Sequence, residues 1–295
     1  MKDRSKLLGY LYAVFTITVW GSTFISSKVL LRHYTPSQIM LTRFLLAYAA
    51  LWLLRPKKLC LTGKQEIIFL LLGLSGCSVY FYTENTALIY TLASNVSIIV
   101  AAAPIFTAIL AHFAGVERFR KSTLLGFLVA FAGVVLVVFN GTFVLKLNPL
   151  GDLLALAAAM CWATYSVLLR KGGDGLDSLL VTRRTLFWGI VTAAPMVLLE
   201  SAPFPAELLT APVIAGNFLF LGLIGSGLCF VLWNKAFSYL GIVTTNTFIY
   251  VQPFITIITA RLFLSEPISP LALLGAVLIT VGVVVSQSKT KAEVE

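Results

Sequence analysis

Long apolar blocks follow one another along the whole chain, and short polar breaks separate them. A helix needs about 20 predominantly apolar residues to cross the hydrocarbon core of a bilayer. Most of the breaks contain a proline or two glycines, which favour a turn or a helix end. The pattern predicts ten transmembrane helices: Leu8 to Leu31, Gln38 to Leu54, Glu66 to Ile89, Ala93 to Ala114, Thr123 to Phe139, Asp152 to Leu169, Leu179 to Leu199, Val213 to Phe237, Val243 to Leu264 and Leu271 to Ser286.

The composition excludes a water-soluble fold. Hydrophobic residues make up 59% of the chain and charged residues only 12%, whereas soluble domains usually carry about 25% charged residues. A soluble fold of this length could not cover so much apolar surface, so the lipid bilayer has to cover part of it. Because backbone polar groups must be satisfied inside lipid, the sequence predicts an all-α integral membrane protein.

Lysine and arginine are distributed very unevenly between the predicted loops. If the N-terminus is cytoplasmic, the opposite side carries only Arg32 and Lys146. The cytoplasmic loops and span ends carry 16 basic residues: Lys2, Arg4, Lys6, Arg55, Lys57, Lys58, Lys64, Arg118, Arg120, Lys121, Arg170, Lys171, Arg183, Arg184, Lys289 and Lys291. The positive-inside rule therefore predicts a multi-pass protein of the cytoplasmic membrane with both termini in the cytoplasm. This distribution also explains the net charge of +10 without a nucleic-acid partner.

An internal repeat relates the two halves of the chain. A shift of 149 residues aligns the third to fifth predicted spans with the eighth to tenth without a gap, and a shift of 142 aligns the first with the sixth. The matches include Gly76 with Gly225, Phe81 with Phe230, Asn85 with Asn234, Pro104 with Pro253, Glu117 with Glu266, Trp20 with Trp162 and Lys28 with Arg170. Because each unit holds five spans, the second starts on the opposite side of the membrane. We expect two inverted five-helix repeats, residues 1–145 and 146–295, an architecture recurrent among secondary transporters.

These residues resemble a known family. The first predicted span contains Trp20-Gly21-Ser22-Thr23-Phe24, and each half contains a proline followed by a glutamate, Pro104…Glu117 and Pro253…Glu266. Over nearly its whole length the chain resembles the drug/metabolite transporter superfamily, specifically the EamA-type ten-span carriers. The resemblance implies a central cavity formed by spans one to four and six to nine, with spans five and ten at the periphery. It also implies export of amino acids or other metabolites, with nucleotide sugars and phosphorylated sugars as substrates of more distant branches.

The first three predicted spans each contain a charged residue away from their cytoplasmic ends: Lys28, Arg43 and Glu84. Charges within a membrane are energetically expensive and mark a functional site by default. All three lie in the outer third of neighbouring predicted spans, so we expect a cluster of formal charge +1 that binds an anionic group, such as an amino-acid carboxylate. Alternatively, the two cations extend to the outer headgroups, and Glu84 pairs with one of them. Glu84 is also the candidate for proton coupling, although nearby cations would favour its ionised form.

Polar and aromatic residues on shared helix faces form a second candidate set. Buried amides and hydroxyls in lipid cost free energy, so these residues are expected to point inward, toward a substrate. Hydrogen bonds between helices and an interfacial aromatic belt are the alternatives. With the three charged residues, the predicted substrate-binding set is Trp20, Phe24, Lys28, Arg43, Tyr80, Glu84, Trp162, Tyr165, Asn234, Asn246 and Tyr250.

Two prolines and two glutamates recur at matching positions of the halves. Pro104 and Pro253 fall in the middle of predicted spans, where a proline removes a backbone hydrogen bond and bends the helix. They are candidate hinges, and inherited helix shape is the alternative. Glu117 and Glu266 fall at span ends, where we expect a structural role at loop amides or at a helix N-terminus.

The function that fits best is secondary transport of a small metabolite, most simply export of an amino acid or a related compound. The chain has no Walker motif, so transport would use a gradient or exchange. The alternatives are another solute, such as a drug, a nucleoside or a sugar phosphate, and a membrane receptor that transports nothing. An intramembrane enzyme would need paired carboxylates, a histidine cluster or an activated nucleophile, and the sequence shows none. With two histidines and isolated cysteines, no metal or cofactor is expected. The sequence leaves open whether the protein is a monomer or a homodimer.

Overall fold

The computed structural model of the protein describes residues 2–116, short stretches between 125 and 136, and residues 149–173, 175–268 and 270–287. Every regular element within these residues is helical. The elements are α1 (Lys2–Leu30), α2 (Pro36–Leu54), α3 (Gly63–Gly73), η1 (Leu74–Ser78), α4 (Val79–Tyr90), α5 (Ala93–Val100), α6 (Ala103–Phe113), α8 (Pro149–Gly172), α9 (Ser178–Glu200), η2 (Ala206–Thr210), α10 (Pro212–Leu219), η3 (Phe220–Leu228), α11 (Cys229–Leu240), α12 (Ile242–Asn246), η4 (Thr247–Val251), α13 (Gln252–Leu264) and α14 (Pro270–Gln287).

Where the structure describes them, the predicted spans are helical apart from a few turn residues, such as Ala101 and Ala102 in the fourth span. Seven continuous helical runs are long and apolar enough to cross a membrane. In addition, α9 and α14 coincide with the seventh and tenth predicted spans. The predicted fifth span, Thr123 to Phe139, lies almost wholly outside the described residues. A bundle of this kind has to be embedded in lipid, because many large apolar side chains on its outer surface are exposed.

Local sequence explains where several of these helices begin. Thr35 accepts a hydrogen bond from the backbone amide of Gln38, whose side chain accepts one from the Thr35 amide in return, which is a capping box at the start of α2. Thr62 and Gln65 form the same motif at the start of α3. Asp177 accepts two backbone hydrogen bonds at the start of α9. These caps set the ends of helices that the apolar pattern alone places only approximately.

Four of the long runs are irregular near their middle, and they form two pairs. The run from α3 to α4 contains the π-helical turn η1, and the run from α10 to α11 contains the π-helical segment η3. The other two are broken: two residues separate the end of α5 from the start of α6, and α12 continues through the 3₁₀ turn η4 into α13. Pro104 and Pro253 lie in the first turns of α6 and α13. A proline is tolerated there because its missing N–H would be unpaired anyway, so both prolines mark breaks rather than smooth bends.

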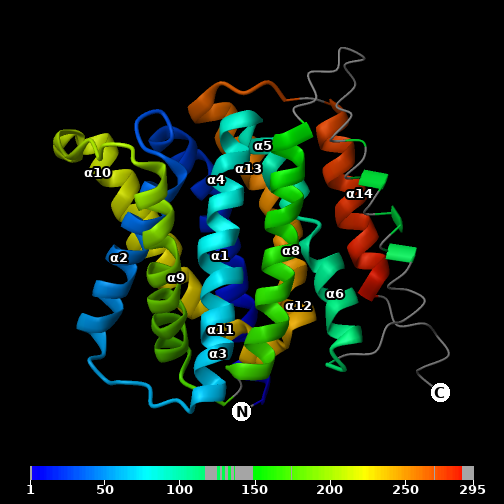
Figure 1. Cartoon of the computed structure of the whole chain (residues 1–295). Helices are drawn as coiled ribbons and strands as arrows, with labels where there is room; N and C mark the ends of the chain where they lie inside the picture. Colours follow the sequence, from blue (N-terminus) through cyan, green and yellow to red (C-terminus); the bar gives the residue numbers. More distant parts are fainter. Residues whose placement is uncertain are drawn as a thin grey trace, which may run out of the picture.

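The packing places α1 and α8 at the centre of two similar groups of helices (Figure 1). Helix α1 packs against α11 and α13, and α8 packs against α4, α5 and α6. Helix α2 packs against α9, and η3 packs against both α1 and α2. Helix α14 contacts η4 and lies at the edge of the bundle in Figure 1. The two π-helical segments and the two broken helices are thereby brought around one central region.

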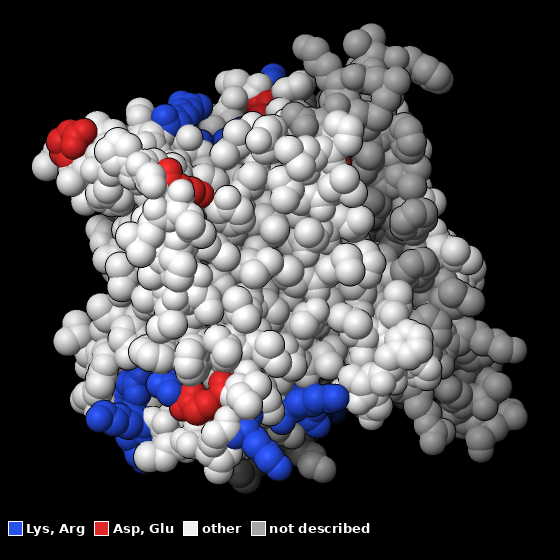
Figure 2. Space-filling model, in the orientation of Figure 1, with Lys and Arg blue, Asp and Glu red and all other residues white. Residues whose placement is uncertain are grey.

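Basic side chains gather at the end of the bundle where the N-terminus lies (Figures 1 and 2). Ion pairs connect elements there, between Arg55 and Asp177 and between Arg184 and Glu66. We call this end the basic face; Arg55, Lys57, Lys58, Lys64, Arg170, Lys171, Arg183 and Arg184 are among its basic residues, because they lie at the end of α2, the start of α3, the end of α8 and the start of α9. The opposite end carries the last turn of α1 and the connection between α13 and α14.

Candidate functional site

A small cavity lies where the irregular helices meet. It has a volume of about 20 Å³, which is enough for about one water molecule. Side chains therefore fill most of the central region in this conformation. The residues that line the cavity are Trp20, Thr23, Arg43, Tyr80, Phe81, Glu84, Val100, Trp162, Phe230, Ile249 and Gln252.

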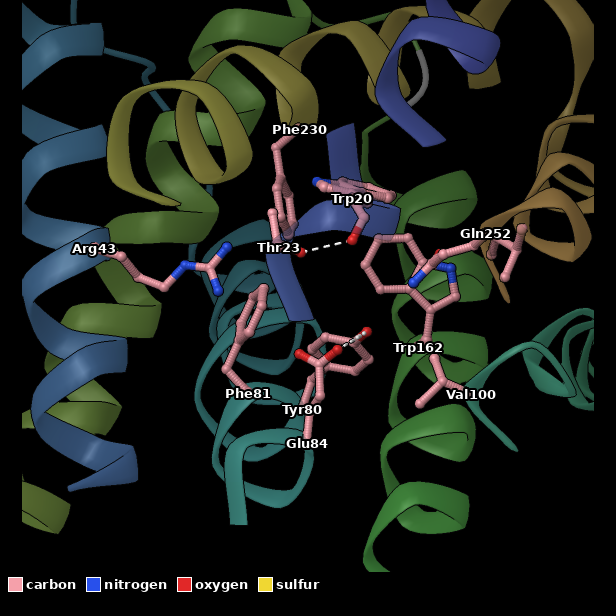
Figure 3. A pocket seen from close by; sticks show the side chains of 11 residues that line it. Trp20, Thr23, Arg43, Tyr80, Phe81, Glu84, Val100, Trp162, Phe230 and Gln252 are labelled. Carbon is pink, nitrogen blue, oxygen red and sulfur yellow. Dashed lines mark hydrogen bonds between the residues drawn. The ribbon is translucent and has the colours of Figure 1, made fainter. Parts of the chain in front are cut away.

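Arg43 enters the cavity from α2 (Figure 3). Its side chain is only 1% exposed. The Nε atom donates a hydrogen bond of 2.7 Å to Ser226 Oγ in η3, and the guanidinium lies 4.1 Å from the centre of the Phe81 ring. Among the described residues, its two terminal nitrogens have no hydrogen-bond partner. One buried cation therefore keeps two donor nitrogens free beside the cavity.

Glu84 and Tyr80 enter the cavity from α4, one helical turn apart. Both are buried, and Tyr80 Oη donates a hydrogen bond of 3.2 Å to Glu84 Oε1. Phe81 packs edge-on against Tyr80 and lies under the Arg43 guanidinium, so this ring separates the opposite charges (Figure 3). Within the described part of the chain Arg43 and Glu84 form no ion pair with each other, so each charge is only partly satisfied.

Aromatic rings form most of the remaining wall. Trp20 packs against Trp162 with ring centres 5.1 Å apart and against Phe230 at 5.4 Å. Trp20 Nε1 donates to the Gly225 carbonyl within η3 at 2.9 Å. Gly225 lies inside the π-helical segment η3, and segments of this kind occur often at functional sites. The irregular helix and the aromatic wall thus hold each other in place.

Lys28 differs from the predicted cluster, because it does not line the cavity. Its Nζ atom pairs with Glu266 Oε1 at 3.2 Å and donates to the Thr91 carbonyl at 2.8 Å. The expected cluster of Lys28, Arg43 and Glu84 is therefore wrong for Lys28, and with it the expected surplus charge of +1. Arg43 and Glu84 remain in the cavity, and their formal charges cancel.

Glu266 has the structural role that its position at a span end predicts. It is buried and accepts hydrogen bonds from the amides of Ala93 and Ser94 at the start of α5 and from Ser94 Oγ. The connection between α13 and α14 folds over the first turn of α5, and this brings the Glu266 carboxylate within reach of Lys28. Its repeat equivalent, Glu117, lies outside the described residues.

Three other predicted binding residues form hydrogen bonds between helices. Asn246 accepts a hydrogen bond from Trp162 Nε1 at 3.2 Å and donates to Ser166 Oγ at 3.2 Å, so it orients a cavity residue from behind. Tyr165 Oη donates to Asn234 Oδ1 at 3.0 Å. None of these three lines the cavity in this conformation.

Phe24 and Tyr250 are buried in the hydrophobic core and also lie outside the cavity lining. Of the predicted set, the cavity thus brings together Trp20, Arg43, Tyr80, Glu84 and Trp162. The lining residues absent from the predicted set are Thr23, Phe81, Val100, Phe230, Ile249 and Gln252. The match of Phe81 with Phe230 in the repeat was a usable clue for two of them, whereas Val100 and Ile249 line the cavity only because their helices break there.

This protein has long apolar helices, paired breaks near the middle of those helices, and a buried cavity that contains charged residues. These features are typical of a multi-pass membrane transporter. Comparison with known proteins identifies the family. The chain belongs to the EamA-like transporter family, whose profile matches it twice, over residues 7–139 and 149–287.

Several proteins are similar in sequence to this chain over almost their full length. An uncharacterized transporter of Archaeoglobus fulgidus is 28% identical, and the alignment covers 95% of this chain and 97% of the relative. The uncharacterized transporter YyaM of Bacillus subtilis is 29% identical, with 94% and 90% covered. A protein of Streptantibioticus cattleyicolor named a probable terminal-alkyne amino-acid exporter is 27% identical, with 94% and 92% covered. One crystal structure shares the fold with a TM-score of 0.71 at 19% identity, covering 97% of this chain and 98% of the other.

Proposed function

We propose that the protein is a secondary transporter that exports a small zwitterionic metabolite, an amino acid or a close relative, through the central cavity. One observation carries this proposal: Arg43 and Glu84 face a single aromatic-lined cavity as opposite charges without pairing with each other. An uncompensated charge inside a membrane protein is energetically expensive. A solute that brings the complementary charges would remove much of that cost when it binds.

The two free nitrogens of Arg43 suit a carboxylate, because a guanidinium can bind both of its oxygens at once. Glu84 would accept hydrogen bonds from an ammonium group, and the faces of the surrounding rings attract a cation as well. A sugar phosphate fits less well, because its additional negative charge would lie near Glu84. The cancelling charges in the cavity thus favour a zwitterion, whose carboxylate is the kind of anionic group that the sequence predicts.

Movement of such a solute requires the cavity to open, since about 20 Å³ cannot hold it. We propose that the two halves, residues 1–145 and 146–295, are inverted five-helix repeats that exchange conformations. The two matches of the family profile and the paired helix irregularities support this division. In this mechanism the helix breaks at Pro104 and Pro253 are the bending points.

The proposed topology has ten spans with both termini on the cytoplasmic side of the cell membrane, and the collection of basic residues at one end supports it. Export is favoured by the name of the relative from Streptantibioticus cattleyicolor. The absence of a Walker motif from the sequence favours transport driven by a gradient or by exchange.

The test is entrance counterflow in liposomes, with a panel of labelled amino acids, nucleosides, sugar phosphates and quaternary amines. We expect saturable uptake of one or more amino acids, and a loss of at least about tenfold in Arg43→Ala, because a hydrogen-bonded charge contributes about 1.5–3 kcal/mol. Glu84→Gln should lose transport of zwitterions more than transport of the corresponding N-acylated acids. Arg261→Ala is the matched control, since Arg261 is an exposed arginine of α13. Normal amino-acid transport by both cavity variants, or uptake of cations alone, would refute the proposal.

A further inference from the structure

A second and larger chamber lies at the basic face. It has a volume of about 250 Å³ and is formed by the end of α8, the start of α9, the end of α11 and the start of α12. Arg170, Gly175 and Ser238 at its rim are exposed, whereas Asn234 at its inner end is only 5% exposed. We call this chamber the vestibule. Arg170, Ser178, Asn234 and Ser238 supply polar groups among its apolar side chains, and its volume suits water or a small polar solute.

A thin layer of side chains separates the vestibule from the central cavity. Asn234, which lines the vestibule, and Phe230, which lines the cavity, lie four residues apart on α11. Four residues of α-helix rise by about 6 Å. Tyr165 lies between the two spaces, with its ring centre 5.2 Å from that of Trp162 and 6.1 Å from that of Phe230.

Hydrogen bonds hold this layer closed. Tyr165 Oη donates to Asn234 Oδ1 at 3.0 Å, and Asn234 Nδ2 donates to Thr182 Oγ1 at 2.9 Å. The three residues belong to α8, α11 and α9, so the bonds connect three helices. Because Asn234 already borders the vestibule, water can replace its partners when the helices separate, and the opening costs little net hydrogen-bond energy.

The opposite side of the cavity is held differently. There Glu266 connects the segment after α13 to α1 and to the start of α5 through an ion pair and backbone hydrogen bonds. A buried charged residue that loses its partners leaves a larger desolvation cost than a neutral amide that water can reach. The two ion pairs of the basic face join α9 and its N-cap to Arg55 after α2 and to Glu66 of α3, and neither pair crosses the vestibule. The side with the vestibule is therefore the easier one to open from this conformation.

We propose that the vestibule is the chamber through which a solute reaches the cavity from the basic face, and that Tyr165, Asn234 and Thr182 form the closed gate between the two. This inference rests on the proposed transport function, and it assigns Tyr165 and Asn234 to gating rather than to substrate binding. The solute that passes is the same small zwitterion, and the amide and hydroxyl groups of the gate can hydrogen-bond with either of its charged ends.

The experiment measures labelling of a cysteine in the cavity by a polar, membrane-impermeant thiol reagent. The reporter is Thr23→Cys in a chain with Cys60 and Cys161 changed to serine, studied in vesicles of both orientations. Ser238→Cys at the exposed vestibule rim identifies the orientation in which the basic face is accessible. Labelling does not require a transported solute, so the gate and the transport function can fail independently.

We expect the reporter to react slowly from the basic face, and about fivefold faster after Tyr165→Phe, which removes one hydrogen bond worth about 1 kcal/mol. Asn234→Ser should have a similar or larger effect, and it keeps the test valid if the tyrosine variant fails to fold. Thr192→Val is the matched control, because Thr192 bonds Ser78 at 2.8 Å between α9 and η1 without touching the gate. The proposal of a gate would be overturned if the reporter cysteine reacted at equal rates in the gate and control variants, or if it reacted only from the face opposite the basic face.

Discussion

Glu266 allows a quantitative test of the side of the bundle opposite the basic face. Helix α5 starts at Ala93, and its N-cap residue, Leu92, has no side chain that can cap the helix. Glu266 supplies the missing acceptors, with hydrogen bonds of 2.9 Å from the Ala93 amide and 3.3 Å from the Ser94 amide. The same carboxylate pairs with Lys28 at 3.2 Å. The sequence separation between these two partners is 238 residues.

The expected cost of Glu266→Ala follows from these contacts. Loss of a helix cap destabilises by about 1 kcal/mol, and loss of a hydrogen bond to a charged group by about 1.5–3 kcal/mol. The second figure is reduced because the Lys28 side chain is 25% exposed and keeps the Thr91 carbonyl as a partner. We therefore expect a total of about 2–4 kcal/mol, or a fall of roughly 5–10 °C in the thermal midpoint.

The assay is thermal unfolding of the purified protein in detergent, followed by tryptophan fluorescence, for Glu266→Ala, Lys28→Met and the double variant. The ion pair predicts a coupling of about 1 kcal/mol between the two sites, because the double variant loses the pair only once. Glu266→Gln should fall between the parent and Glu266→Ala, since the amide retains one acceptor oxygen. A midpoint for Glu266→Ala within about 1 °C of the parent, or strictly additive effects, would refute the reasoning.

Two further predictions concern other parts of the bundle. A Cβ atom on Gly76 would lie 2.2 Å from the Tyr165 ring, so Gly76→Ala should destabilise by about 1–3 kcal/mol, whereas Gly216→Ala, with nothing within 4 Å, should not. Burial acts to raise the pKa of Asp177, but two backbone amides and the Arg55 guanidinium hold it below its ordinary value. The stabilisation that results is present above about pH 4 and is lost as the pH falls through the lowered pKa. Asp177→Asn keeps an oxygen that can cap the helix but carries no charge, so it should abolish this fall in stability at low pH. Because the Arg55–Asp177 ion pair is partly exposed, the difference in stability between the parent and the variant should stay below about 1 kcal/mol. Denaturant or thermal midpoints measured across pH 3–7 check both the sign and the size.

Much of the helical framework follows from local features of the sequence. Apolar runs of sufficient length place the spans, and Thr35 and Thr62 start their helices through capping boxes with residues three positions later. Pro104 and Pro253 were expected in the middle of helices, and the structure places them in the first turn after a helix break. A proline fits there because the backbone N–H that it lacks would have no partner within the helix. All of these effects act within a few residues, so they can be read along the chain.

The cavity depends on contacts between residues that are far apart in sequence. The pairing of Lys28 with Glu266, the bond from Arg43 to Ser226 and the placing of Asn246 behind Trp162 each join different helices. Sequence spacing shows which residues share a helix face, but it does not show which neighbouring helix that face meets or at what height. For this reason Phe24, Tyr250 and Asn246 resembled cavity residues, although they face the core or another helix.

The order of residues alone establishes that this protein crosses a membrane, where most of its helices run, and that charged side chains lie within the spans. Those properties depend on apolar length, on helix caps and on the cost of charge in lipid, all of which are local. The folded structure alone shows that Lys28 pairs with Glu266 outside the cavity, so that Arg43 and Glu84 remain as the two opposite charges of the cavity. Electrostatic pairing depends on distance in space, and the folded arrangement of the helices sets that distance.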